Sequence, residues 1–544
     1  MTTIDPHLAT AGTAGDRADG VLSSLAAWIT TSDHKKIGRL YIATSLLLLL
    51  AVGAVAGLLG IERIDATSDF IDSGAMPQLF SLYRVVLTFG VVAPLGLGLA
   101  VAVVPLQLGA RALAFPRLAL AGFWAWLLGM VLVIVSIALN GGPGGGDPEM
   151  VDLFLVAHIA VVLGLIATAG AVATSVLTTR APGMNMRRVP LFAWGALIGS
   201  LAMLLLLPVL VATLVMVAVD HRYGRNTFGG NTGIADWVGF AFTQPATFVY
   251  ALPVFGFAAE ATATATRNRF PLRGVAFTGI ALVGTGLFAG VTQTQASLPR
   301  DVLHQSFGDF LTDVLPFLLL EALPVLGPVV LLGVIGLALK PPTRPRLSAA
   351  FVASILGAGM VFTGMAGNLV YQIGDAQLAG TVFEEGAWLY ISYGLVIAAL
   401  GALTYWGPKL WGRRIDDKKS LPLVGLAFIA TVLAALPLYV AGFAKQPAGA
   451  TQFDYSGPQD LWNTLSAAGH LLMLVTVLAF IGLAITSFRS GDHAGDDPFD
   501  GQTLEWATTS PPPADNFAEV FVISSPEPLL DLKPVRTAAS EGTA

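Results

Sequence analysis

The chain lacks cysteine altogether and carries little charge. Its 544 residues include no Cys, and 12% are charged whereas 55% are hydrophobic. The absence of cysteine excludes disulfides, iron–sulfur clusters and thiolate metal sites. About a quarter of the residues in a soluble domain are usually charged. The low charge and the mean hydropathy of +0.73 therefore indicate a polytopic membrane protein.

Histidine is also scarce, with seven residues in the whole chain. Five of them fall in tails or short polar connections: His7, His34, His221, His304 and His493. Only His158 and His470 lie inside apolar stretches. Few imidazole nitrogens are therefore available for metal binding within the hydrophobic part of the chain.

Apolar stretches long enough to cross about 30 Å of hydrocarbon number twelve. The sequence thus predicts an all-α bundle of twelve transmembrane helices, and the polar, acidic first 20 residues predict no cleavable signal peptide. The expected spans lie near residues 40–60, 80–105, 117–140, 151–178, 190–218, 237–262, 272–293, 309–338, 347–369, 378–404, 421–443 and 461–487.

The distribution of cations predicts the orientation. With a cytoplasmic N-terminus, the inner connections hold twenty Lys and Arg residues and the outer connections five. Because cations resist translocation, both termini are expected to be cytoplasmic in a multi-pass protein of the cell membrane. We expect a tail over 1–27, the helical domain over 28–487 and a proline-rich tail over 488–544 whose apolar piece at 520–523 docks against the bundle or a partner.

Several short motifs occur in an order that is similar to subunit I of cytochrome c oxidase, a member of the heme-copper oxidase family. They are WITTSDHKKIG at 28–38, PLQLGAR at 105–111, AFPR at 114–117, ALP at 251–253, YWGPK at 405–409, LWNT at 461–464 and LEWATTSPPP at 504–513. The resemblance covers roughly residues 28–525 and implies the twelve-helix fold of that subunit. It also implies a lipid bilayer and other membrane subunits as partners, whereas the net charge of −6 comes largely from acidic tails and indicates no nucleic acid.

The resemblance implies a low-spin heme held by two histidines and a high-spin heme held by one. The family's ligand on the second span corresponds to Tyr83, with Arg84 directly after it. Counting back from Tyr405 places the two ligands of the tenth span at Gly386 and Trp388. Glycine has no side chain, and an indole nitrogen is only a donor. We therefore expect that the heme ligands are lost.

The family's copper site, held by three histidines, is altered in the same way. Its histidine, carboxylate and phenol on the sixth span correspond to Gln244, Ala246 and Phe248. The histidine pair of the seventh span corresponds to about Thr294 and Gln295. We expect no heme, copper or catalytic residues at these positions. The polar residues of the family's proton routes are also replaced, because two of their positions correspond to Ala112 and Val101. Glu321 is the only charged residue in the interior of the eighth span.

His158 and His470 admit two interpretations. A single histidine inside a span is most often a buried hydrogen-bonding group, and we favour that interpretation. Alternatively the two jointly hold one heme in a new place, since polar groups inside spans are often functional. Two ligands cannot serve three metals, so either interpretation excludes a complete oxidase centre.

Charges inside the spans suggest an ion pair. Arg84 on the second span and Glu384 with Glu385 on the tenth lie in segments that face each other across the low-spin heme in the family. An unpaired charge costs about 2.5–3.5 kcal/mol at the centre of a membrane helix. We expect Arg84 to pair with one of these carboxylates, although all three could also extend to water near the helix ends.

The sequence thus favours a non-catalytic subunit or paralogue in a respiratory membrane complex. An active terminal oxidase, which transfers electrons to oxygen and pumps protons, is one alternative. A transporter or channel that uses the vacated cavities is another, and fold analogy alone does not decide between them.

Overall fold

The computed structural model describes residue 23 and residues 26–532, apart from 66–69, 73, 240–245, 300–305, 451–452, 455–456 and 520. These described residues form helices and connecting turns, and their only β-type pairings are three isolated bridges. Twelve helices are long and apolar enough to cross a membrane. The twelve-helix, all-α fold predicted from the sequence is confirmed.

The spans are in several cases composite, because π turns or short breaks divide them. In chain order they are α2 (His34–Glu62); α3 (Met76–Val85), η1 (Val86–Val92) and α4 (Ala93–Gln107); α5 (Pro116–Ala138); α6 (Pro148–Thr178); α7 (Leu191–Arg222); η3 (Ala246–Ala251) and α9 (Leu252–Thr266); α10 (Arg273–Gly284) and α11 (Leu287–Thr292); α12 (Phe307–Asp309), η5 (Phe310–Val314), α13 (Leu315–Phe317), η6 (Leu318–Ala322) and α14 (Leu323–Ala338); α15 (Ala349–Tyr371); α16 (Phe383–Trp411); α17 (Asp417–Phe443); and α18 (Gln459–Ser490). The shorter helices outside the spans are η2 (Met186–Arg188), α8 (Gly230–Gly239), η7 (Gly374–Ala376), η8 (Leu504–Ala507) and α19 (Pro528–Leu532).

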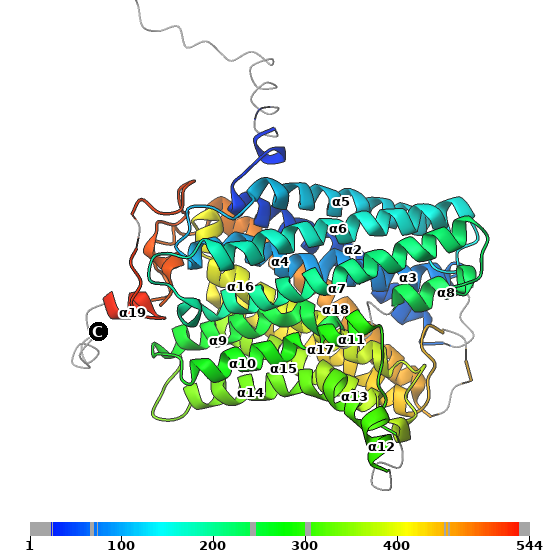
Figure 1. Ribbon diagram of the computed structural model, residues 1–544. Coiled ribbons are helices and arrows are strands. Elements are labelled where there is room, and N and C mark those ends of the chain that lie inside the picture. Colours follow the sequence, from blue (N-terminus) through cyan, green and yellow to red (C-terminus); the bar gives the residue numbers. More distant parts are fainter. Residues whose placement is uncertain are drawn as a thin grey trace, which may run out of the picture.

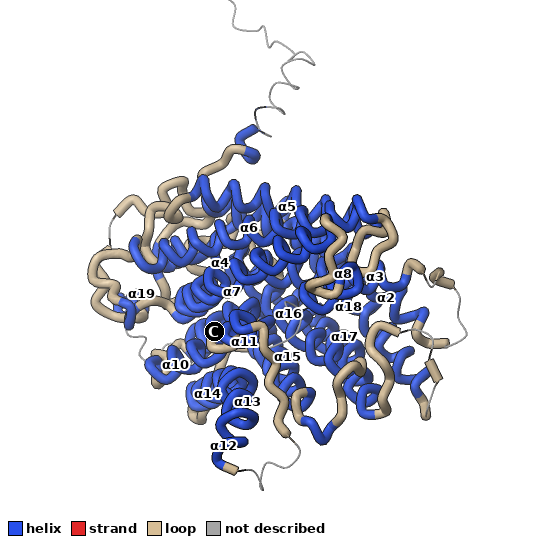
Figure 2. The backbone as a smooth tube through the Cα atoms, turned by 45° about the vertical axis from the view of Figure 1, so that its right-hand side comes forward, coloured by secondary structure: helices blue, strands red, loops and turns tan. Residues whose placement is uncertain are grey.

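The helices run side by side, with α4 and α16 inside the bundle and α5 and α14 on opposite sides of it (Figures 1 and 2). The most apolar windows of the span from α3 to α4 and of α16 are wholly buried, whereas those of most other spans are about half buried. Large side chains such as Leu128 and Val475 remain exposed on the outer helices. A lipid-facing surface explains this pattern, because apolar side chains need not be covered there.

The α8 end of the bundle, where α3 begins, lies opposite the α19 end, where the chain finishes (Figure 1). The span beginning with α3 contains the π turn η1 (Val86–Val92). Such a turn widens the helix and disturbs its regular hydrogen bonds. Trp126 on α5 supplies a hydrogen bond to the backbone of this turn, since its Nε1 donates to the carbonyl of Phe89 at 2.7 Å. α4 begins directly afterwards at Ala93, and its second residue, Pro94, has no N–H that needs a partner.

The two terminal motifs meet at the α19 end through the side chain of Asn516. Its Nδ2 donates to the carbonyl of Ala110 at 2.8 Å and lies 2.9 Å from Nε2 of His34. Lys35 donates to Oδ1 of Asn516 at 2.9 Å. His34 completes the network with Nδ1, which donates to the carbonyl of Val101 at 3.0 Å. Asn516 thus connects the C-terminal segment to the beginning of α2 and the end of α4.

Glu505 and Glu260 form a second buried contact between the C-terminal segment and the bundle. The amide Nε2 of Gln107 donates to Glu260 at 2.5 Å and to Glu505 at 3.1 Å. Trp406 donates its indole N–H to Glu505 at 3.2 Å. This arrangement indicates a structural role for Glu260, which connects α9 to α4 and to the C-terminal segment.

The rest of the C-terminal segment follows the α19 end of the bundle. The backbone N–H of Ile523 donates to the carbonyl of Pro182 at 2.8 Å, and Ile523 is buried. Arg273 forms an ion pair with Glu527 at 3.1 Å. Burial raises the pKa of Glu527, although the neighbouring Arg273 and Arg269 act in the opposite direction. Ile523 therefore docks as expected for the apolar piece, of which Val520 lies outside the described residues.

The first prediction concerns Asn516. Replacing it with alanine leaves His34, Lys35 and the Ala110 carbonyl without their buried partner. We expect the Asn516→Ala variant to lose about 1–3 kcal/mol of stability, measured as a lower thermal unfolding midpoint of the detergent-purified protein. The exposed Asn226 supplies the control, and Asn226→Ala should unfold like the wild type. An equal midpoint for both variants would contradict the role of Asn516.

Candidate functional site

Tyr83 and Trp388, two of the residues predicted to replace heme ligands, lie where α3 meets α16 near the α8 end. Tyr83 on α3 contacts Trp388 on α16 edge to face, with ring centroids 5.2 Å apart and ring planes at 84°. His470 on α18 lies on Tyr83 as well, at 6.1 Å between centroids. Tyr83 and Trp388 are each 2% exposed. Three aromatic rings therefore pack together at this place.

Gly386, the other position of interest on α16, faces a neighbouring helix. A Cβ atom on Gly386 would lie 2.9 Å from the carbonyl oxygen of Ala435 and 3.2 Å from Cβ of Leu438, both on α17. The small residue allows the two helices to approach closely. Any larger side chain at Gly386 would force α16 and α17 apart.

Glu385 forms a buried ion pair, but with Arg63 and not with Arg84. Arg63 donates from Nη2 to Oε2 at 2.8 Å and from Nη1 to Oε1 at 3.1 Å. The two side chains are 5% and 6% exposed. The structure therefore corrects the proposed pairing. Arg63, directly after the end of α2, binds both oxygens of the Glu385 carboxylate in a bidentate geometry. Arg84 therefore does not pair with Glu385.

The backbone and side chain of Arg63 are fixed by several neighbours. Asn463 on α18 donates from Nδ2 to the Arg63 carbonyl at 2.9 Å, and Gln446 donates to Oδ1 of Asn463 at 2.9 Å. The guanidinium also lies 4.7 Å from the ring centre of Phe80. Sequence reasoning missed Arg63 because it placed this residue among the loop cations. Its position within three residues of the end of the first predicted span was the available signal.

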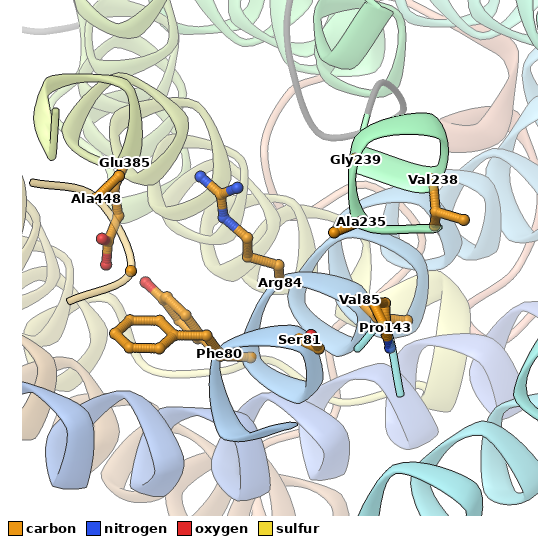
Figure 3. A pocket seen from close by; sticks show the side chains of 12 residues that line it. Phe80, Ser81, Arg84, Val85, Pro143, Ala235, Val238, Gly239, Glu385 and Ala448 are labelled. Atoms are coloured by element: carbon orange, nitrogen blue, oxygen red, sulfur yellow. The ribbon is translucent and has the colours of Figure 1, made fainter. Parts of the chain in front are cut away.

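Arg84 instead lines a cavity of about 220 Å³ at the α8 end. Figure 3 shows its side chain extending from α3 into the space between Glu385 and Ala235. Within the described part of the chain, no hydrogen bond or salt bridge of Arg84 is found. Glu384 accepts a long hydrogen bond of 3.5 Å from the hydroxyl of Tyr371, and its Oε1 has no partner among the described residues.

The positions that correspond to the family's copper site are not assembled into one site by the described residues. Phe248 is buried in η3, whereas Thr294 and Gln295 are exposed just beyond the end of α11. Gln244 and the side chain of Ala246 lie outside the described residues. In the part that is described, no three His, Cys, Asp or Glu side chains gather in a way that could hold a metal ion.

The two histidines inside spans have different surroundings. Nδ1 of His470 forms a hydrogen bond of 2.8 Å with the hydroxyl of Tyr393. His470 is thus a buried hydrogen-bonding group, the interpretation that we favoured from the sequence. His158 is fully buried against the rings of Phe89 and Phe154, at 4.9 and 5.6 Å between centroids. Neither nitrogen of His158 has a hydrogen-bond partner among the described residues. The hydrogen-bonding role that we favoured is therefore found for His470 and not for His158 among the described residues, and a heme held jointly by the two remains a hypothesis.

Known proteins resemble the chain over most of its length. The family model described as "Cytochrome C and Quinol oxidase polypeptide I" matches residues 36–482. A putative cytochrome c oxidase subunit 1-beta of Streptomyces coelicolor is 30% identical, over 94% of this chain and 91% of the relative. The cytochrome c oxidase subunit 1 of Bacillus sp. strain PS3 is 29% identical, over 93% and 84% respectively. The resemblance drawn from the motifs is thereby confirmed.

The second prediction tests the ion pair. Removing either charge leaves its partner buried and unpaired, which costs about 3–5 kcal/mol in comparable pairs. We expect Arg63→Gln and Glu385→Gln each to lower the thermal unfolding midpoint strongly, and the double variant to lose much less than the sum of the two. Arg222 pairs with Asp152 but is 69% exposed, so Arg222→Gln should change little. Additive losses in the double variant would exclude the coupling.

Proposed function

The chain belongs to the cytochrome c and quinol oxidase polypeptide I family, and we propose that it is a non-catalytic member that binds neither heme nor copper and acts as a subunit of a membrane complex. The single observation that carries this proposal is the direct contact between Tyr83 and Trp388. These residues stand at two of the positions where the resemblance places heme ligands.

The residues at this position do not fit a heme. Two axial ligands must stand on opposite faces of the macrocycle, but the rings of Tyr83 and Trp388 touch each other at 5.2 Å between centroids. A phenol can bind heme iron in other proteins, yet a planar macrocycle would have to separate Tyr83 from both Trp388 and His470. Gly386 offers no donor atom, and its place against α17 leaves no room for a larger side chain.

The copper positions support the same proposal through their donor chemistry. Copper in proteins favours imidazole and sulfur ligands, and the chain has no cysteine. Thr294 and Gln295 supply hydroxyl and amide groups on an exposed segment. Phe248 carries no polar atom at the position of the family's phenol.

The fold agrees with a role in a membrane assembly. Members of this family work within multi-subunit membrane complexes, and the twelve spans make this chain a multi-pass membrane protein. We propose that it resides in the cell membrane with both termini cytoplasmic, because twenty of twenty-five cations near the spans then lie inside. The partners we infer are other membrane subunits of an oxidase-like complex.

An active terminal oxidase is the alternative that the names of the relatives favour. The ring contacts at Tyr83 argue against it. For a transporter we find less support, because the cavity between α4, α9 and α16 has a volume of only about 20 Å³ and apolar walls that include Leu99, Pro253 and Leu395. A substrate path would need polar groups there.

The third prediction is that the purified protein carries no stoichiometric heme. We expect its absorption spectrum, taken after expression in heme-replete cells, to lack a Soret band near one heme per chain, because Tyr83, Gly386 and Trp388 provide no ligand pair. A heme-binding family member purified from the same cells serves as the positive control. A stoichiometric Soret band that persists in the Tyr83→Phe variant would place heme elsewhere in the chain and refute the proposal.

The fourth prediction concerns copper and oxygen. Without three imidazoles, the protein should contain far less than one copper per chain by elemental analysis. Membranes in which it is the only family member should consume no oxygen with reduced cytochrome c or quinol. The same membranes with an active family member control for the assay. Stoichiometric copper or oxygen consumption that depends on this chain would favour the active oxidase instead.

A further inference from the structure

The cavity at the α8 end contains a cation that the fold has not neutralised. Its volume is about 220 Å³, and it is lined by α3, α8, the loop containing Pro143 and the segment around Ala448. Arg84 extends into it (Figure 3). No hydrogen bond or ion pair of this guanidinium is found in the described part of the chain.

A second unused donor lines the same cavity. The hydroxyl of Tyr83 is buried and has no hydrogen-bond partner among the described residues, although Tyr83 is only 2% exposed. A buried hydroxyl without a partner costs about 1–3 kcal/mol. Both Tyr83 and Arg84 line the cavity, so one acceptor group of a ligand could receive hydrogen bonds from both.

We propose that this cavity binds a small ligand through its carboxylate, which Arg84 and the Tyr83 hydroxyl hold. The planar guanidinium presents two parallel N–H groups that match a carboxylate, and the hydroxyl can supply a further bond. The remaining walls are largely apolar and include Phe80, Val85 and Val238. They suit a short hydrocarbon portion attached to the carboxylate.

The charges around the cavity favour a carboxylate over a phosphate. Glu385 also lines the cavity, but its charge is balanced by Arg63, whose guanidinium is occupied by that pair. Among the described residues that line the cavity, Arg84 is the one cation, so it can balance a single negative charge of a ligand. A phosphate carries up to two charges and three acceptor oxygens, which exceeds what one arginine and one hydroxyl can satisfy.

A carboxylate could come from a free short-chain acid or from a fatty acid in the membrane, and the experiment distinguishes the two. The full-length protein, purified in detergent with a fixed chloride concentration, is titrated with butyrate, with oleate and with inorganic phosphate. Binding is measured by calorimetry and by the rise in unfolding midpoint that a ligand of the native state produces. The variants are Arg84→Gln, Arg84→Lys, Tyr83→Phe and the exposed-cation control Arg225→Gln.

We expect saturable binding of butyrate to the wild type and to Arg225→Gln. The affinity of Arg84→Gln for butyrate should be lower than that of the wild type by a factor of about ten or more. The affinity of Arg84→Lys should lie between those of Arg84→Gln and the wild type, because lysine keeps the charge but lacks the two parallel N–H groups of arginine. Tyr83→Phe should weaken binding about threefold to tenfold, the loss of one hydrogen bond. Binding of oleate alone with the same dependence on Arg84 would identify the membrane as the source of the carboxylate.

Three results would overturn the proposal. They are the absence of saturable binding for both carboxylates, equal binding by the wild type and Arg84→Gln, and saturable binding of phosphate alone. Because Arg84 has no hydrogen bond or ion pair among the described residues, Arg84→Gln should elute and unfold like the wild type without ligand. If it does not, Arg84→Lys retains the charge and decides the outcome by its intermediate affinity.

Discussion

The buried ion pair between Arg63 and Glu385 determines the arrangement of the α8 end. Two charges that are each about 5% exposed can remain inside a membrane protein only if they neutralise each other. Their pairing ties the end of α2 to the first turn of α16, and Asn463 connects the same point to α18. Because both oxygens of Glu385 are taken up by Arg63, Arg84 lies across the cavity without a carboxylate of its own.

The aromatic cluster beside this pair solves a packing problem. Protein interiors are close-packed, so space between α3 and α16 must be filled by side chains or by a bound group. Tyr83, Trp388 and His470 fill it with rings at 5.2 and 6.1 Å from Tyr83. Tyr393 holds His470 in turn. The cluster is therefore a continuous part of the core, and a macrocycle would require its rearrangement.

The sequence predicted the number of spans and the family, because hydropathy and short motifs are local signals. The predicted partner of Glu385 was wrong, since Arg63 lies 322 residues away in the sequence and only the folded helix bundle brings the two side chains together. The π turn at Val86–Val92 was equally hidden, because an extra residue in a uniformly apolar helix leaves no mark on hydropathy. Gln244 lies outside the described residues, so the reading of the copper position remains a prediction.

The two ends of the bundle differ in how they relate to the family pattern. At the α19 end, residues from both terminal motifs form one hydrogen-bonded network around Asn516, and Glu505 contacts Gln107 and Trp406. At the α8 end, the expected ligand positions carry Tyr83 and Trp388, and Arg84 stands beside an open cavity. Under the proposed function, the α19 end supplies the helix contacts and the α8 end carries the altered ligand positions. A subunit that provides shape needs the helix contacts but not the metal ligands.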